Sequence, residues 1–191
     1  MRTVILSLSC MAVALGQAPP TDISEGHDVT AAPARQEFGI TTAIRVGDRT
    51  TRAATGYVGL QWAFLITTTR QLTVQYVLEG RPFVQVAHSG QPSTNGWSVS
   101  PAGVRTILRN HFYLDTAGGL LRTRITPAEQ ASGVSQYYRT WEIGSGVQLG
   151  RASRINARIG YKYLRAWNSS IAAYDFTAHM ISAGVFFPAR R

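Results

Sequence analysis

Several stretches of this chain alternate apolar and polar residues strictly, and this two-residue period limits the folds that the chain can adopt. The clearest stretch, 136–149, keeps its large apolar side chains on one parity: Tyr137, Trp141, Ile143, Val147 and Leu149. Its other parity holds Thr140, Glu142 and Gln148. Similar alternation covers 36–46, 56–66, 71–80, 97–109, 111–121, 153–164 and 176–187. Because successive residues of a strand face opposite sides, the sequence predicts an all-β protein with eight strands.

Charged residues on the polar parity favour a membrane barrel over a soluble one. They are Glu79, Glu142, Arg154, Arg158 and Lys162. A membrane barrel turns apolar side chains outward and polar ones inward, whereas a soluble barrel does the reverse. Charges of both signs can pair in a narrow barrel interior, so we expect salt bridges from the two glutamates to Arg154 or Arg158.

The lengths of the connections support the membrane barrel independently. Short gaps at 67–70, 109–110 and 150–152 alternate with long ones at 47–55, 81–96, 122–135 and 165–175. Outer-membrane barrels join their strands by tight periplasmic turns and longer outer loops, and the last strand here ends in Phe186 and Phe187. We therefore predict an eight-stranded antiparallel up-and-down β-barrel in the cell outer membrane. Pro101, which cannot donate to a ladder, predicts a bulge or kink.

The N-terminal residues predict export. Arg2 precedes an apolar run that ends in small residues, which is typical of a signal peptide and too short for a membrane-spanning helix. The predicted organisation is a signal peptide over 1–16 with cleavage after Gly16 or Ala18, a flexible lead-in over 17–34, a barrel over 35–187 and a tail over 188–191.

Composition narrows the chemistry. Cys10 is the only cysteine and lies in the predicted signal peptide, which excludes disulfides, thiol catalysis and cysteine-based metal sites from the exported chain. No histidines stand at metal-ligand spacing, and neither a metal nor a cofactor is expected. The net charge of +9 favours anionic partners such as phosphorylated lipid, and export makes nucleic acid an unlikely partner. The sequence carries no signal of oligomeric state.

The segment GYKYLRAWNSS (160–170) ends a strand with unusual residues. Tyr161, Tyr163, Arg165 and Trp167 share the outward parity at the predicted extracellular rim. The tyrosines are typical of an interfacial aromatic girdle. Arg165 has two interpretations that the sequence leaves open: an anchor that reaches the interface, or a partner for a lipid phosphate.

The same segment, followed by FTAHMISAGVFF, resembles the C-terminal hairpin of the outer-membrane lipid A 3-O-deacylase family, also called the acyloxyacyl hydrolase family. The segments QYVLEGRPFVQV and SVSPAGVR resemble further parts of that family, so the resemblance spans 37–187. It implies an eight-stranded barrel that hydrolyses the ester-linked acyl chain at the 3-position of lipid A. It also implies a serine nucleophile, a histidine base and a downstream partner residue on the outer barrel face.

The chain departs from the family at the catalytic pair. The histidine position falls on Arg165, the serine position on Trp167 and the partner position near Thr177, while Asn168 matches the family. A permanently protonated arginine cannot act as a base, and tryptophan offers no nucleophile. We therefore expect a binding or structural protein that contacts lipid A, or lipopolysaccharide of the outer leaflet. The expected contacts are Tyr163, Arg165, Trp167 and Asn168.

Two alternatives stay open. In the first, the chain is still a lipid A ester hydrolase that uses a relocated set of Ser169, Asp175 and His179. The four-residue separation of Asp175 from His179, about 13 Å on an extended strand, and the outward parity of His179 weigh against that set. In the second, the chain is a soluble exported barrel that binds an apolar ligand inside.

Overall fold

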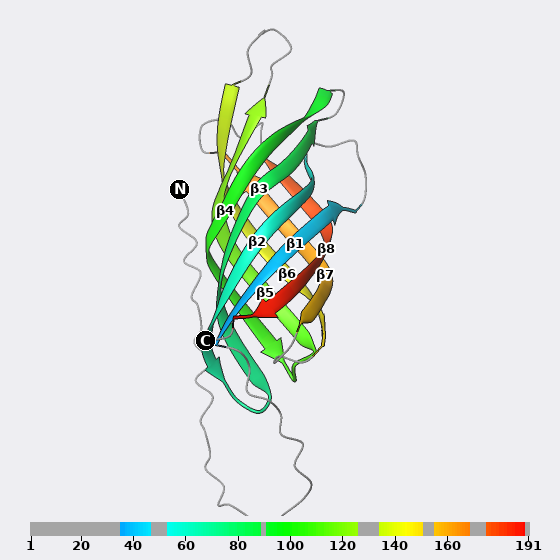
Figure 1. The fold of residues 1–191 in the computed structure, drawn as a ribbon. Coiled ribbons are helices and arrows are strands. Elements are labelled where there is room, and N and C mark those ends of the chain that lie inside the picture. The colour runs from blue at the N-terminus through cyan, green and yellow to red at the C-terminus, as the bar shows by residue number, and fades with distance from the viewer. Residues whose placement is uncertain are drawn as a thin grey trace, which may run out of the picture. The chain divides into compact units, whose positions relative to one another are not determined.

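The chain folds into one closed barrel of eight antiparallel strands (Figure 1). The computed structural model describes residues 35–46, 53–88, 91–125, 134–150, 155–168 and 175–189. The strands are β1 (Gln36–Arg45), β2 (Ala53–Thr68), β3 (Leu72–His88), β4 (Gln91–Leu108), β5 (Phe112–Ile125), β6 (Val134–Leu149), β7 (Asn156–Trp167) and β8 (Phe176–Pro188). Each strand pairs with the next, and β1 closes on β8. The predicted all-β, up-and-down barrel is therefore confirmed.

Residues 1–34 and 190–191 lie outside the described part of the chain, so the signal peptide, the cleavage site and the lead-in stay predictions. Strand β8 extends to Pro188, one residue beyond the predicted barrel. Within the described ranges no helix is long and apolar enough to cross a membrane.

Along most of the barrel, apolar side chains face out and polar ones face in. On β7, Ile159 and Tyr161 are 48% and 46% exposed, while Arg158 and Lys162 on either side of this pair are buried. On β6 as well, the parity that the sequence shows to be apolar faces outward and the polar parity faces inward. An apolar exterior around a charged interior is the arrangement of a membrane barrel, so the soluble alternative is wrong.

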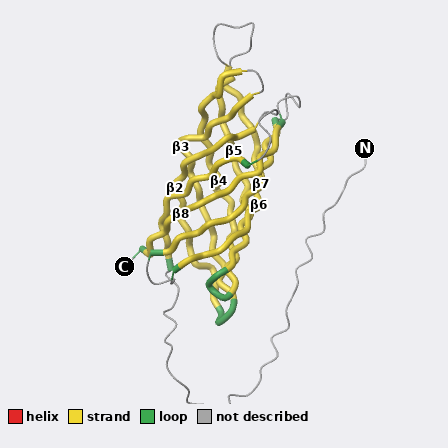
Figure 2. Tube along the Cα trace, turned by 90° about the vertical axis from the view of Figure 1, so that its right-hand side faces the viewer, coloured by secondary structure: helices red, strands yellow, loops and turns green. Residues whose placement is uncertain are grey.

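The barrel has two ends that differ in their connections. At the first, which we call the turn end, short turns join β2 to β3 and β4 to β5, and β8 ends there (Figure 2). In the turn after β4, Arg109 and Asn110 both have positive φ, of 47° and 59°, and the His111 amide donates to the Leu108 carbonyl at 3.0 Å. This is a type I′ turn, whose twist matches that of the flanking strands. We call the opposite end the loop end.

Near the loop end the two faces exchange polarity. The buried interior becomes an apolar cluster of Ala43, Tyr57, Val84, Val86, Leu121, Tyr138, Leu164, Ala166, Phe176, Ala178 and Met180. The outward residues at this level include the polar Gln85, Asn95, Arg122, Arg124, Arg139, Arg165 and Thr177, beside exposed Ile44, Phe83, Trp97 and Tyr137. Polar groups outside and apolar groups inside are typical of a barrel section in water. The reversal therefore marks where the strands leave the apolar layer of the membrane.

The height of the apolar exterior agrees with that boundary. On β6 the outward residues from Trp141 to Leu149 carry no charge. Eight residue steps of about 3.3 Å, tilted by about 40°, span roughly 20 Å along the barrel axis. Membrane barrels carry an apolar band about 25 Å tall, so Trp141 lies near the upper edge of such a band.

A bulge lies at Pro101, as predicted. Ser100 and Gly103 are buried in the barrel, whereas Pro101 and Ala102 between them are both exposed. The register of β4 shifts by one residue here against both neighbouring strands. A bulged residue is left out of the ladder, which is why a proline without an N–H group is tolerated there.

A second proline bulge lies on β3 and was not predicted. Pro82 and Phe83 are both exposed between the buried Arg81 and Val84, with register shifts against β2 and β4. The sequence interpretation placed a long connection over 81–96, a stretch that includes Pro82. That prediction is wrong: β3 continues to His88 and β4 begins at Gln91. The predicted gaps 122–135 and 165–175 are likewise shortened by strand residues.

Two glycines make room for an interior tyrosine. Gly146 on β6 and Gly160 on β7 lie directly opposite each other on the inward face. A Cβ at either position would overlap the Tyr113 hydroxyl and backbone of the paired strand. Gly146 and Gly160 thus admit the Tyr113 ring into the lumen.

Candidate functional site

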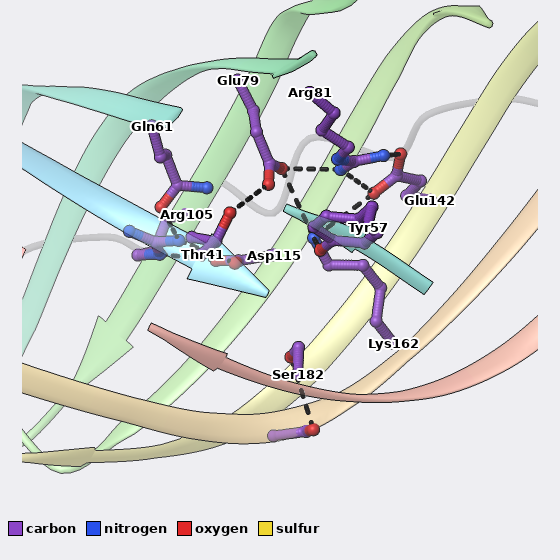
Figure 3. Close-up of polar contacts among 11 residues, drawn as sticks. Thr41, Tyr57, Gln61, Glu79, Arg81, Arg105, Asp115, Glu142, Lys162 and Ser182 are labelled. Carbon is purple, nitrogen blue, oxygen red and sulfur yellow. Dashed lines mark hydrogen bonds and ion pairs between the residues drawn. The ribbon is translucent and has the colours of Figure 1, made fainter. Parts of the chain in front are cut away.

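The barrel interior contains a network of buried ion pairs (Figure 3). Arg81 on β3 lies 2.6 Å from Glu79 and donates two hydrogen bonds to Glu142 on β6. Lys162 lies 3.4 Å from each glutamate and 2.8 Å from the hydroxyl of Tyr57. The prediction that the two glutamates form salt bridges inside the barrel is therefore confirmed.

One of the predicted partners of those glutamates, Arg158, is wrong, because it pairs with Glu37 at 2.7 Å. The other, Arg154, lies outside the described residues, so its pairing stays a prediction. Arg158 stands opposite Gln148 on β6, six residues along the strand from Glu142, and therefore lies nearer the turn end. Closure of β1 onto β8 brings Glu37 to that level, a relationship that no local sequence pattern reveals.

This network fills the lumen instead of forming a ligand site. Its cations are Arg81, Arg105, Arg158 and Lys162, and its carboxylates are Glu37, Glu79, Asp115 and Glu142. These charges balance, with Arg105 held 2.7 Å from Asp115. Two interior cavities have volumes of about 20 Å³ each, room for a single water. The described part of the interior is therefore filled by side chains whose charges cancel.

The outer face carries an aromatic belt where its polarity changes. The rings of Trp141 and Tyr163 are 6.3 Å apart, and those of Tyr163 and His179 are 5.2 Å apart. The hydroxyl of Tyr161 and Nδ1 of His179 form a hydrogen bond. The predicted outward parity of these residues is confirmed. Their amphipathic rings lie at the level where such side chains contact lipid headgroups.

Two arginines alternate with two tryptophans along the edge of this belt. Arg165 on β7 pairs in register with Trp141 on β6, and Trp167 pairs with Arg139. We call Arg139, Trp141, Tyr163, Arg165 and Trp167 the β6–β7 rim. Both arginines are exposed. None of the ion pairs within the described ranges involves either of them.

Asn168 lies at the end of the rim and is held by its neighbours. Its side-chain amide donates to Gln136 at 2.9 Å, and its backbone N–H donates to the Asp175 carboxylate at 2.8 Å. This carboxylate is therefore engaged with the backbone at the end of β7. Among the described residues no cluster of three or more metal-ligating side chains occurs.

The positions at which the resemblance implied a base, a nucleophile and their partner lie together but hold other chemistry. Arg165 pairs in register with Thr177 on β8, and Trp167 lies two residues further along β7. For the relocated set, His179 contacts Tyr161 and Asp175 contacts Asn168, while Ser169 lies outside the described residues. Hydrolysis by that set stays a prediction.

Sequence reasoning missed Arg139 as a member of the rim. The signal was present, because Arg139 shares the outward parity of Tyr137 and Trp141. It also missed Arg122 and Arg124 on β5, since 111–121 was ended too early. Trp97 stood at the start of the predicted strand 97–109 but was not assigned to a site.

Comparison with known proteins finds likeness in fold only. No family model matches the chain, and no curated protein matches it. The crystal structure of Neisserial surface protein A (NspA) is similar, with a TM-score of 0.50 and 14% sequence identity over 82% of this chain and 98% of that one. The Yersinia pestis outer membrane protein Ail in a phospholipid bilayer nanodisc has a TM-score of 0.45 and 14% identity over 81% of this chain and 99% of its own.

The likeness to NspA agrees with a closed eight-stranded barrel. The apolar outer band and the ion-paired lumen are the features of an outer-membrane barrel. The chain is an outer-membrane β-barrel protein.

Proposed function

We propose that this barrel binds lipid A, the phosphorylated anchor of lipopolysaccharide, in the outer leaflet through its β6–β7 rim. In this proposal it is a binding or structural relative of the lipid A 3-O-deacylase family. The observation that carries the proposal is the placement of Arg139 and Arg165. Both are exposed, both stand beside tryptophans, and both lie where the exterior changes from apolar to polar.

The chemistry of the rim suits a lipid with a phosphorylated headgroup. An arginine guanidinium donates two parallel hydrogen bonds to a phosphate, and a lipid-facing aromatic belt packs beside the acyl chains. No carboxylate competes for the rim arginines within the described ranges, since the strand carboxylates face the lumen and Asp175 is held by Asn168. Tyr163 and Asn168 add a hydroxyl and an amide beside the same lipid.

Binding without hydrolysis is the better supported form of the proposal. Neither Arg165 nor Trp167 can supply the base or the nucleophile of an ester hydrolase. His179 forms a hydrogen bond with Tyr161, and the carboxylate of Asp175, just before β8, accepts from the backbone N–H of Asn168. The imidazole therefore has no orienting carboxylate among the described residues. A relocated hydrolase would need both contacts to rearrange.

The test is retention of lipid A by the full chain purified in detergent micelles, with the bound lipid quantified by mass spectrometry. The Arg139→Gln, Arg165→Gln double variant should retain about ten-fold less lipid A, as expected when charge-assisted hydrogen bonds to phosphate are lost. Arg70→Gln, an exposed arginine at the turn end, is the matched control and should retain the wild-type amount. Equal retention by all three proteins would rule out the rim as a lipid A site.

A further inference from the structure

A groove of about 360 Å³ opens on the outer face of the barrel near the loop end. Its lining residues come from β4, β5 and β6: Asn95, Gly96, Trp97, Arg122, Thr123, Arg124 and Ser135. Pockets that hold small molecules have volumes of roughly 300–1,000 Å³, so the groove is large enough for a ligand of that class.

Arg122 is held in place by groups on both sides of it. Trp97 on β4 and Tyr137 on β6 are its partners in register. Its guanidinium carbon lies 5.5 Å from the centre of the Tyr137 ring, and Nη2 donates to the Ser135 hydroxyl at 3.0 Å. A guanidinium fixed in this way loses little conformational entropy when it binds an anion.

The floor of the groove requires a glycine. A Cβ on Gly96 would overlap the carbonyl oxygen of Arg122, because β4 and β5 approach closely there. Gly96 shares the inward parity of its partner Thr123, so it presents only backbone to the groove. The floor is therefore backbone, with side chains that contact a ligand only along the walls.

The walls are positively charged. Arg122 and Arg124 lie two residues apart on the same face of β5, about 7 Å along the strand, and the described residues of the lining include no carboxylate. Across β6 the two arginines stand opposite Tyr137 and Ser135. These lie further toward the loop end than Trp141, which places the groove in the section with a polar exterior.

We propose that this groove binds a phosphorylated sugar. Arg122 and Arg124 would hold the phosphate, since paired guanidinium groups suit its oxygens. Trp97, which is 42% exposed, offers a flat apolar face on which a sugar ring packs, while the Asn95 amide and the Ser135 hydroxyl bind sugar hydroxyls. The sugar phosphate belongs either to a lipid headgroup in the same membrane or to a soluble molecule.

The groove and the β6–β7 rim are separate sites, and the four tryptophans of the chain allow both to be followed at once. Trp97 reports on the groove, Trp141 and Trp167 report on the rim, and Trp62 lies on the outer face of β2. The full chain is labelled with 5-fluorotryptophan in detergent micelles, and its fluorine NMR resonances are assigned by single tryptophan-to-phenylalanine variants.

The first arm titrates glucosamine 1-phosphate, with glucosamine as the control that lacks phosphate. The second arm adds bicelles with and without lipopolysaccharide. We expect a saturable shift of the Trp97 resonance. A shift with glucosamine 1-phosphate supports the site for soluble sugar phosphates, and a shift only with lipopolysaccharide supports it for a headgroup. No Trp97 shift in either arm, or an equal shift with glucosamine, overturns the proposal.

Variants then assign the binding to the two arginines. Arg122→Gln combined with Arg124→Gln should weaken the Trp97 response about ten-fold, while Arg70→Gln at the turn end should leave it within about two-fold. Arg122 and Arg124 are both on the outer face, and heat-modifiable migration on gels checks that the barrel is closed. A Trp97 response that persists unchanged in the double variant overturns the proposal even where the rim resonances respond.

Discussion

Arg81 on β3 reaches across the lumen to Glu142 on β6, strands that are not neighbours in the sheet. The pair is fully buried, with both side chains no more than 3% exposed. This ion pair links β3 and β6 through the lumen, in addition to the backbone hydrogen bonds that join neighbouring strands around the barrel.

Glu142→Gln should therefore destabilise the barrel. The change keeps the shape of the side chain but leaves the cations Arg81 and Lys162 with a single carboxylate, Glu79. Removing one partner of a buried ion pair costs about 3–5 kcal/mol. Urea unfolding of the refolded barrel in phospholipid vesicles measures the loss. Asp175→Asn, an exposed carboxylate, is the control, and equal midpoints for the two variants would contradict a structural role for the network.

Gly160→Ala should destabilise the barrel by about 1–3 kcal/mol through overpacking. The added methyl group would overlap the Tyr113 hydroxyl and the carbonyl oxygen of Ser145. Gly80→Ala is the matched control, because no atom lies within 4 Å of the position of its Cβ. The same urea series compares them. A variant with Tyr113→Phe in addition tests the cause, since removal of the hydroxyl should restore part of the lost stability.

Arginine substitutions should locate the edge of the membrane. Ile159 and Leu120 are 48% and 49% exposed on the outer face. Ile159 lies within the apolar band, where an arginine costs about 2–4 kcal/mol, whereas Leu120 lies opposite Arg139 near the headgroups, where the cost is about 0–1 kcal/mol. Ile159→Arg should therefore lower the free energy of unfolding much more than Leu120→Arg. Similar losses in vesicles would mean that the polarity reversal does not mark the membrane surface.

Lipid A incubated with the folded full chain should keep all of its acyl chains. The prediction follows from the replacement of the expected base and nucleophile by Arg165 and Trp167. Mass spectrometry of the extracted lipid is the measurement, beside a Ser169→Ala variant. Loss of one 3-hydroxyacyl group, abolished in that variant, would show that hydrolysis has moved to a different serine and that the binding proposal is incomplete.

Alternation predicted the strands well because burial on one face is a strong constraint on every second residue. It identified the outward parity of Tyr161, the inward parity of Lys162 and the bulge at Pro101. The bulge at Pro82 was not predicted, since a proline in a bulge and a proline in a loop look alike in sequence. The bulge on β3 lets the strand continue, so a connection expected to be long is almost entirely strand.

The partners of charged residues could not be predicted, because they depend on register around the closed barrel. Glu37 and Arg158 are far apart in sequence and meet only through the pairing of β1 with β8. The interior of the loop end was missed for another reason. On β7, Leu164 near the loop end faces inward, and so does Lys162, two residues nearer the turn end. The inward parity therefore changes from polar to apolar within one strand, and Phe176 on β8 continues the apolar part.

The balanced lumen has a consequence for how the protein responds to solution conditions. Among the described residues its four cations and four carboxylates cancel, so the excess positive charge of that part of the chain is carried outside the lumen. The single lysine, Lys162, is one of the buried cations, and the remaining basic residues are arginines and four histidines. Arginine keeps its proton at any ordinary pH, while dissolved salt screens exposed charges beyond about 10 Å at 0.1 M. Ionic strength, much more than acidity, should therefore set how strongly this barrel attracts anionic molecules from a distance.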